Sequence, residues 1–157
     1  MHGATELVHG TCVALGRSAA LLRGPSGSGK SDLALRFLSL ARRGPAAVSA
    51  PALVADDQVS LVADGARLLA KPPEGIRGKL EVRGVGIIAV RFLREAELVL
   101  IVDLVAKADI ERLPECDTRA RLLGVELPLL RLAAFEASAP VKLAVALARA
   151  TQPRRCE

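Results

Sequence analysis

The segment from Gly24 to Ser31 constrains this chain more than any other part of its sequence. It matches the pattern Gly-x-x-x-x-Gly-Lys-Ser/Thr in full, with the residues Gly24, Pro25, Ser26, Gly27, Ser28, Gly29, Lys30 and Ser31. Glycines let the backbone curl so that successive N–H groups point at one anion, and a helix that begins near Lys30 adds its positive end. We expect Lys30 to reach the β- and γ-phosphates of a nucleoside triphosphate and Ser31 to bind Mg²⁺. The loop therefore predicts a site for ATP and Mg²⁺.

The residues on either side of this loop have the patterns of a strand and a helix. Ala19 to Leu22 is an apolar run that leads into the glycines and is predicted to be a strand. A helix is predicted over residues 31–43, ended by the break at Gly44-Pro45. Further strands are predicted over 7–15, 52–55, 58–70 (a hairpin that turns at Asp64-Gly65), 79–82, 86–92, 97–104 and, after a break at Pro128, 129–133, and a closing helix over 141–150. This order favours an α/β fold with a mixed β-sheet and flanking helices.

The composition bounds the kind of protein. The chain has 157 residues and no linker or repeat, so we expect one domain over residues 1–157. No apolar stretch approaches the roughly 18 residues of a membrane span, and the first ten residues do not have the pattern of a secretion signal. Cys12, Cys116 and Cys156 lack the spacing of zinc ligands, so we interpret them as reduced thiols of a cytoplasmic protein.

The net charge of +5 raises the question of nucleic-acid binding. The arginines are scattered along the chain, and with no Trp or Tyr and only three Phe the composition predicts no aromatic platform for bases. We therefore expect no nucleic-acid partner, because a surface for phosphates or for an acidic protein explains the charge as well. Adenine is expected to rest on aliphatic side chains and backbone, with loose discrimination between ATP and GTP.

An acidic pair, Asp56-Asp57, closes the apolar strand over 52–55. A second parallel strand would end beside the glycine loop, where carboxylates can hold the metal or take a proton from an attacking hydroxyl. Because side chains alternate along a strand, the two aspartates are expected to point differently and to have different roles. A turn-forming acidic pair is the alternative.

A second unusual stretch runs from Glu81 to Ile87 and reads Glu-Val-Arg-Gly-Val-Gly-Ile. Glu81 and Arg83, two residues apart on a strand, face the same side. Taken alone, this stretch is more often an exposed ion pair beside a bulge.

Together these segments resemble a known family, the catalytic domain of HPr kinase/phosphorylase, a bacterial enzyme that phosphorylates a serine of the phosphocarrier protein HPr. The resemblance rests on His9-Gly10 ahead of the loop, on the continuation Gly-Lys-Ser-Asp-Leu-Ala-Leu, on the strand that ends in Asp56-Asp57, on Glu81 to Ile88, and on Glu111-Arg112-Leu113. It implies a P-loop kinase domain of the HPr kinase/PEP carboxykinase-like type, and an ATP- and Mg²⁺-dependent serine kinase that regulates the phosphotransferase system.

The resemblance also implies roles for matching residues. Lys30 and Ser31 keep the roles derived above, and Asp57 or Asp56 is implied as the base that accepts the serine proton. Glu81 is implied as a Mg²⁺ ligand beside Ser31. His9 and Arg112 would complete the catalytic site, with Arg112 stabilising charge on the transferring phosphoryl group.

Two departures from the family pattern limit what the resemblance implies. Family members carry an additional N-terminal domain, whereas only eight residues precede His9 here, which suggests a short form. Ala133 to Pro140 stands where the family has a basic segment linked to dephosphorylation. We therefore do not extend the family's dephosphorylation reaction or its hexameric assembly to this chain. Whether the chain forms another homo-oligomer is left open. The alternatives are a nucleotide-sensing module without phosphoryl transfer and a small-molecule kinase with a lid around 112–121.

Overall fold

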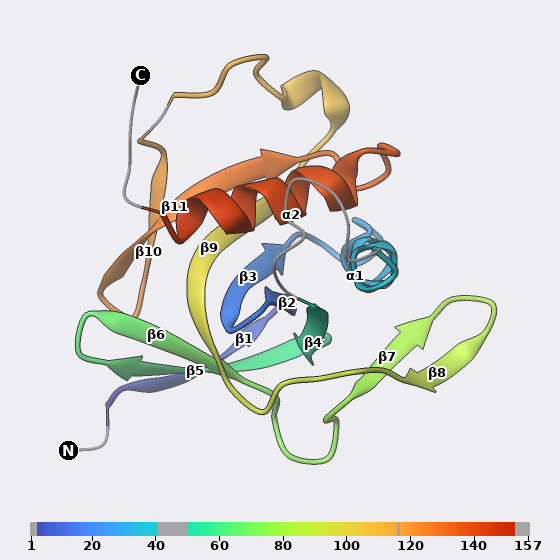
Figure 1. Ribbon diagram of the computed structural model, residues 1–157, viewed down its shortest axis with the longest axis vertical. Coiled ribbons are helices and arrows are strands. Elements are labelled where there is room, and N and C mark those ends of the chain that lie inside the picture. The colour runs from blue at the N-terminus through green and yellow to red at the C-terminus, as the bar shows by residue number, and fades with distance from the viewer. Residues whose placement is uncertain (1–2, 41–49, 116, 153–157) are drawn as a thin grey trace.

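The structure is a computed structural model that describes residues 3–40, 50–115 and 117–152 (Figure 1). Its elements in chain order are β1 (Thr5–His9), β2 (Thr11–Leu15), β3 (Ser18–Arg23), α1 (Lys30–Leu38), β4 (Pro51–Ala55), β5 (Gln58–Asp64), β6 (Arg67–Lys71), β7 (Lys79–Val82), β8 (Gly86–Ala89), β9 (Ala96–Leu104), the 3₁₀ turn η1 (Lys107–Asp109), β10 (Arg119–Leu122), β11 (Val125–Leu132) and α2 (Ala139–Ala150). No helix of these described ranges is long and apolar enough to span a bilayer.

Most of the strands form one mixed sheet in the order β1-β5-β6-β9-β3-β2-β4. Strand β9 is parallel to β3 on one side and antiparallel to β6 on the other, and β11 adds in parallel to β9 with β10 beyond it. The predicted α/β fold with a mixed sheet is confirmed. The three parallel strands β3, β9 and β11 therefore end at the same edge of the sheet, which is where ligands bind in such folds.

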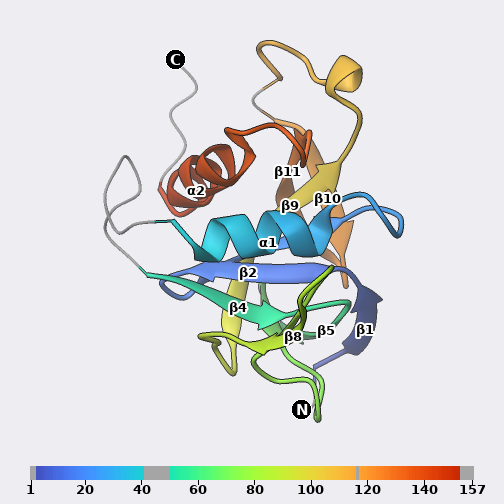
Figure 2. The same ribbon diagram turned by 90° about the vertical axis from the view of Figure 1, so that its right-hand side faces the viewer.

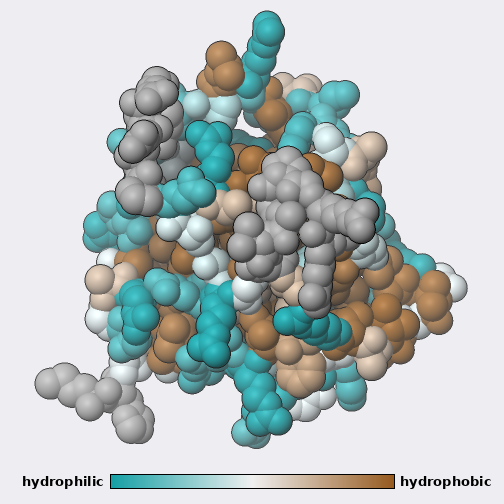
Figure 3. Space-filling model, in the orientation of Figure 1, coloured by the Kyte–Doolittle hydropathy of each residue, from teal (hydrophilic) through white to brown (hydrophobic). Residues whose placement is uncertain are grey.

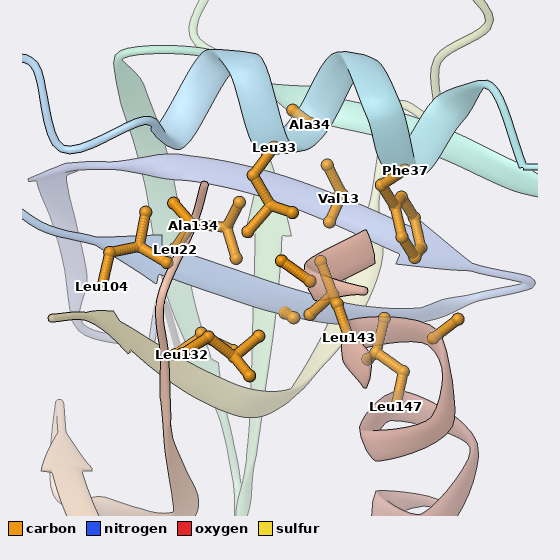
Figure 4. Close-up of a cluster of buried hydrophobic side chains, with 14 of the residues drawn as sticks. Val13, Leu22, Leu33, Ala34, Phe37, Leu104, Leu132, Ala134, Leu143 and Leu147 are labelled. Atoms are coloured by element: carbon orange, nitrogen blue, oxygen red, sulfur yellow. The ribbon is translucent and has the colours of Figure 1, made fainter. Parts of the chain in front are cut away.

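Both helices pack on one face of this sheet (Figure 2). Leu33 and Phe37 of α1 and Leu143 and Leu147 of α2 meet sheet residues such as Leu22 in a buried cluster that we call the helix-side core (Figure 4). The helix α1 presents its apolar residues at spacings of three and four, which places them on one face. Burial of each such side chain stabilises the fold by about 1.5–3 kcal/mol.

The other face of the sheet is covered by the sheet itself. Alternate residues of β3, Ala19 and Leu21, pack with Cys12 of β2 and with Val59 and Leu61 of β5, because the strands β5 and β6 curl over β2 and β3. We call this cluster the curl-side core. The sheet thus separates two cores that share the strands β2, β3 and β9.

The hairpin β7–β8 stands apart from the sheet. Leu80 packs inward into the helix-side core, whereas Val85 and Ile87 are 75% and 72% exposed at the outer end, where hydrophobic side chains gather in Figure 3. The hairpin is anchored at its base and presents an apolar tip to solvent.

Several predicted boundaries were wrong. The strand predicted over 7–15 breaks at Gly10, where the N–H donates to the carbonyl of Asp57, so β1 joins β5 while β2 joins β3 and β4. The strand predicted over 86–92 ends at Ala89, and the helix predicted over 31–43 ends at Leu38; its last residues and the Gly44-Pro45 break lie outside the described residues.

The C-terminal half of the chain also differs from the prediction. Pro128 lies inside β11 instead of breaking the chain, and the strand β10 was missed. Because the Leu129 N–H bonds toward the β10 side, the missing N–H of Pro128 faces the other way, where pairing with β9 begins only at Leu129. The closing helix was predicted, and it begins two residues early with Pro140 in its first turn.

Candidate active site

The loop Gly24–Ser31 connects β3 to α1 at the carboxyl edge of the parallel strands. Gly27 and Gly29 have φ values of 83° and 94°, a region that favours glycine, and they curl the backbone as the motif requires. A Cβ on Gly29 would lie 2.9 Å from the Cβ of Ala134, so the close packing also needs a glycine there. The Leu33 N–H donates to the Gly29 carbonyl and begins α1, which directs the helix N-terminus into the loop.

Lys30 supplies the positive charge of the loop. Its side chain is only 8% exposed, and Nζ donates to the carbonyls of Gly24 at 2.6 Å and Pro25 at 3.0 Å. These bonds hold the ammonium group inside the curl of the loop, where a phosphate would be attracted by the same charge.

Just before the loop, Arg23 and Asp103 join the ends of β3 and β9. The Arg23 guanidinium donates two hydrogen bonds to the Asp103 carboxylate, at 2.7 and 3.0 Å. This bidentate pair fixes the register of the two strands that carry the loop and the adjoining edge.

Asp56 lies against the loop, as its strand position predicted. Strand β4 is antiparallel to β2, and β2 is antiparallel to β3, so β4 runs in the direction of β3 and ends at the loop. The Ser31 hydroxyl donates to Asp56 Oδ1 at 2.9 Å, and the Thr11 hydroxyl donates to the same atom at 2.8 Å. The N–H groups of Asp57 and Glu81 add bonds of 3.1 and 3.4 Å to the carboxylate.

Asp57 points away from this cluster. Its side chain is 77% exposed, its φ is 67°, and Oδ1 lies 3.4 Å from Nδ1 of His9, which is itself 57% exposed. The prediction that the two aspartates point differently is confirmed. The site thus has an enclosed carboxylate on the loop serine and an open carboxylate beside a histidine.

Two predicted site residues do not contribute their side chains to this group in the structure. Glu81 approaches it only through its backbone N–H, its side chain is exposed, and within the described residues it forms no ion pair with Arg83. Arg112 lies in the exposed segment after η1 and makes no hydrogen bond or ion pair with another predicted site residue over the described ranges.

Thr11 is a site residue that the sequence reasoning missed. It is fully buried at the start of β2, where its hydroxyl has Asp56 as a partner. A polar residue opening the otherwise apolar run Thr11 to Leu15 was the available signal, although only the pairing of distant strands brings it to Asp56.

The donor set at this point suits Mg²⁺. Ser31 Oγ and the Asp56 carboxylate are hard oxygen ligands, and Mg²⁺ is commonly held by one or two carboxylates together with the phosphates of its nucleotide and water. No group of three His, Cys, Asp or Glu side chains that could hold a metal occurs in the described part of the chain. Ser31 and Asp56 are thus the residues that would hold Mg²⁺ together with a bound nucleotide.

These features place the chain among P-loop kinase-like domains: a glycine loop between a buried strand and a helix, an acidic strand end on the loop serine, and a mixed curled sheet. A family model described as HPr Serine kinase C-terminal domain matches residues 3–155, and the chain belongs to that family.

Individual relatives agree with this assignment. The chain is 32% identical over 136 residues to the HPr kinase/phosphorylase of Streptococcus thermophilus and 34% identical over 139 residues to that of Chlorobium phaeobacteroides, matches that include 80% and 81% of this chain. They include 41% and 40% of the relatives, so the chain spans about two fifths of their length. The solved structure of the Hpr(Ser) kinase/phosphatase from Coxiella burnetii has the same fold, with a TM-score of 0.74, 22% identity, and coverage of 92% of this chain and 94% of that chain.

Proposed function

We propose that this chain is an ATP-dependent kinase domain that phosphorylates a serine of the phosphocarrier protein HPr and thereby regulates the phosphotransferase system. The observation that carries the proposal is the 2.9 Å contact between Ser31 Oγ and the Asp56 carboxylate, because it joins the phosphate loop and the acidic strand end in one site. Family membership supports HPr as the acceptor.

The loop and its neighbours bind the phosphates in this proposal. The loop N–H groups and Lys30 hold the β- and γ-phosphates. Ser31 and Asp56 would hold Mg²⁺, with Glu81 as a further ligand, and the bound metal neutralises charge on the phosphate oxygens. Arg112 is proposed to approach the transferring group from the exposed segment that contains it.

Asp57 is the proposed base. Its carboxylate is open to an incoming protein, whereas Asp56 is enclosed by four hydrogen-bond donors. Asp57 takes the proton of the acceptor serine, whose oxygen forms a bond to the γ-phosphorus as the bond to the β,γ-bridging oxygen breaks and ADP leaves. His9, 3.4 Å from Asp57, orients the carboxylate.

The test is transfer of phosphate from radiolabelled ATP to purified HPr in the presence of Mg²⁺, followed by identification of the labelled residue. We expect label on a serine, and we expect Asp57→Asn to lower transfer by at least about 100-fold, because a positioned base contributes 10²–10⁴ in rate. ATP affinity, measured by calorimetry, should change less than about threefold, since Asp57 lies outside the phosphate loop. Asp64→Asn is the matched control: it changes another exposed aspartate, one that pairs with Arg67 in the β5–β6 turn.

Label on a histidine, or ATP binding without transfer by correctly folded wild-type protein, would contradict the proposal. The second result would favour a nucleotide-sensing module. Equal transfer by wild type and Asp57→Asn would exclude Asp57 as the base.

A further inference from the structure

A cavity of about 590 Å³ adjoins the phosphate loop, and neither Ser31 nor Asp56 is among its lining residues. Pro25 and Ser28 of the loop form one wall. The last residue of β9 with the three residues after it (104–107), and the residues just after β11 (133–136), form the others. In Figure 2 the loop lies at the right-hand end of α1, with the ends of β9 and β11 above it and the ends of β1 and β4 below it. The volume lies within the 300–1,000 Å³ that is typical of small-molecule sites.

Phe135 gives this cavity an aromatic wall that the composition did not predict. Its ring is 71% exposed although it lines the cavity, and it lies so close to the loop that a Cβ on Gly29 would be 2.9 Å from its Cζ. Exposure of a phenylalanine costs free energy unless a partner covers it. The ring therefore lies directly beside the phosphate-binding loop with most of its surface uncovered.

We propose that the cavity binds the purine base of the nucleotide and that the base stacks on Phe135. The inference takes from the proposed function only that the loop binds a nucleoside triphosphate. The acidic strand end and the open carboxylate of Asp57 lie on one side of the loop, so the γ-phosphate and the acceptor belong there. The opposite end of the same nucleotide then extends toward the carboxyl ends of β9 and β11, and the cavity is the space there.

The polar groups of the cavity support a nucleoside. Ser28 lines it, and its Oγ, which is buried against Gly24, has no hydrogen-bond partner among the described residues. A change of the Ser28 rotamer would bring this hydroxyl to a ligand hydroxyl or phosphate oxygen. The two charged lining residues are Lys107 and Glu136, whose Nζ and Oε1 lie 3.8 Å apart. Glu136 Oε2 also accepts a hydrogen bond from Lys142 Nζ at 2.7 Å. The remaining walls are apolar, so most of the binding free energy from the base comes from stacking and burial and little from recognition of its polar edge.

The experiment compares ATP with inorganic tripolyphosphate, both with Mg²⁺, by calorimetry on the full chain. Phe135→Ala should lower the affinity for ATP by about 5- to 150-fold, the range that loss of one base–aromatic stack produces. It should leave the affinity for tripolyphosphate unchanged. Ile87→Ala is the matched control, because it truncates a side chain that is equally exposed, at 72%, on a different element. Circular dichroism of each variant confirms that it is folded.

A second variant reports the stacking directly. The chain has no tryptophan, so Phe135→Trp introduces a single fluorophore at the cavity. ATP should quench its emission and bind at least as tightly as to the wild type, whereas tripolyphosphate should leave the emission unchanged. GTP should quench it as well, because the cavity offers few groups that distinguish one purine from another.

The inference is overturned if Phe135→Ala leaves the affinity for ATP unchanged, or if it lowers the affinities for ATP and for tripolyphosphate equally. That failure is distinct from failure of the kinase proposal. If the protein transfers phosphate to HPr but its ATP affinity does not depend on Phe135, only the base-site proposal is rejected. If ATP affinity depends on Phe135 but no phosphate is transferred to HPr, only the kinase proposal is rejected.

Discussion

Asp56 is nine-tenths buried and yet accepts four hydrogen bonds. A buried carboxylate is costly unless its lone pairs are satisfied, and here two hydroxyls and two backbone N–H groups satisfy them. Thr11 is the one side-chain donor among them that is itself fully buried. The position of the carboxylate on Ser31 therefore depends on a residue outside the phosphate loop.

We expect Thr11→Val to lower the free energy of unfolding by about 1–3 kcal/mol, because it removes a hydrogen bond to a carboxylate while nearly conserving shape. Thr5→Val is the matched control: it makes the same change at an exposed position, where the effect should stay within about 0.5 kcal/mol. Urea denaturation followed by circular dichroism measures both. Equal midpoints for the two variants would mean that Thr11 does not support Asp56.

At the scale of elements, Arg36 connects α1 to the turn that precedes α2. Its guanidinium donates to Asp32 within the helix at 2.9 Å, to the carbonyl of Glu136 at 3.1 Å, and to the carbonyl of Ala134. Ala134 and Glu136 are also walls of the cavity beside the loop. One side chain thus fixes the distance between the helix that begins at the phosphates and the turn that carries Phe135.

Arg36→Met should cost about 1–3 kcal/mol of unfolding free energy, because two carbonyls lose a charged donor. Asp32→Asn, which removes only the pair within the helix, should cost about 0.3–0.5 kcal/mol. The Met variant should also lower the affinity for ATP more than the affinity for tripolyphosphate, since the displaced turn belongs to the base cavity. Denaturation curves and calorimetry measure the two effects, and equal losses for both variants would contradict the connecting role of Arg36.

Glu136 makes the same turn sensitive to pH. The hydrogen bond and charge of Lys142 hold the pKa of Glu136 below its ordinary value of 4.5. A carboxyl with a lowered folded-state pKa stabilises the fold above its unfolded pKa, and that stabilisation is lost as the pH falls through the lowered value. Glu136→Gln should therefore lower the thermal midpoint at pH 7, and the difference from wild type should narrow below pH 4.5. A difference that is constant from pH 7 to pH 3 would contradict this assignment.

The elements that sequence reasoning predicted are those with local causes. The phosphate loop, the β5–β6 turn at Gly65 and the Pro140 start of α2 are each determined by residues within a few positions. Non-local contacts determined what was missed. Gly10 ends β1 because it bonds to Asp57, and Phe135 becomes a cavity wall only because the end of β11 lies beside the loop.

At the scale of the whole molecule, one sheet connects two cores. Leu147 of α2 belongs to the helix-side core and Cys12 of β2 to the curl-side core, and β3 and β9 contribute alternate residues to both. Loss of packing on one face should therefore loosen the strands that hold the other. We therefore predict that the described part of the chain unfolds as one cooperative unit.

Cys12 provides a probe for that prediction. It is fully buried, and burial raises the pKa of its thiol, so the reactive thiolate forms only when the structure opens. In a Cys116→Ser, Cys156→Ser background, labelling of Cys12 by a thiol reagent then measures opening of the curl-side core.

Leu147→Ala removes packing worth about 2–5 kcal/mol from the opposite core. If the chain is one unit, labelling of Cys12 should speed up by about 30- to 5,000-fold, the same free energy expressed as an opening equilibrium. Val141→Ala, at a 42% exposed position of the same helix, should change the rate by no more than about twofold. A Leu147→Ala variant with a lowered helix signal and unchanged Cys12 labelling would instead mean that the two cores open independently.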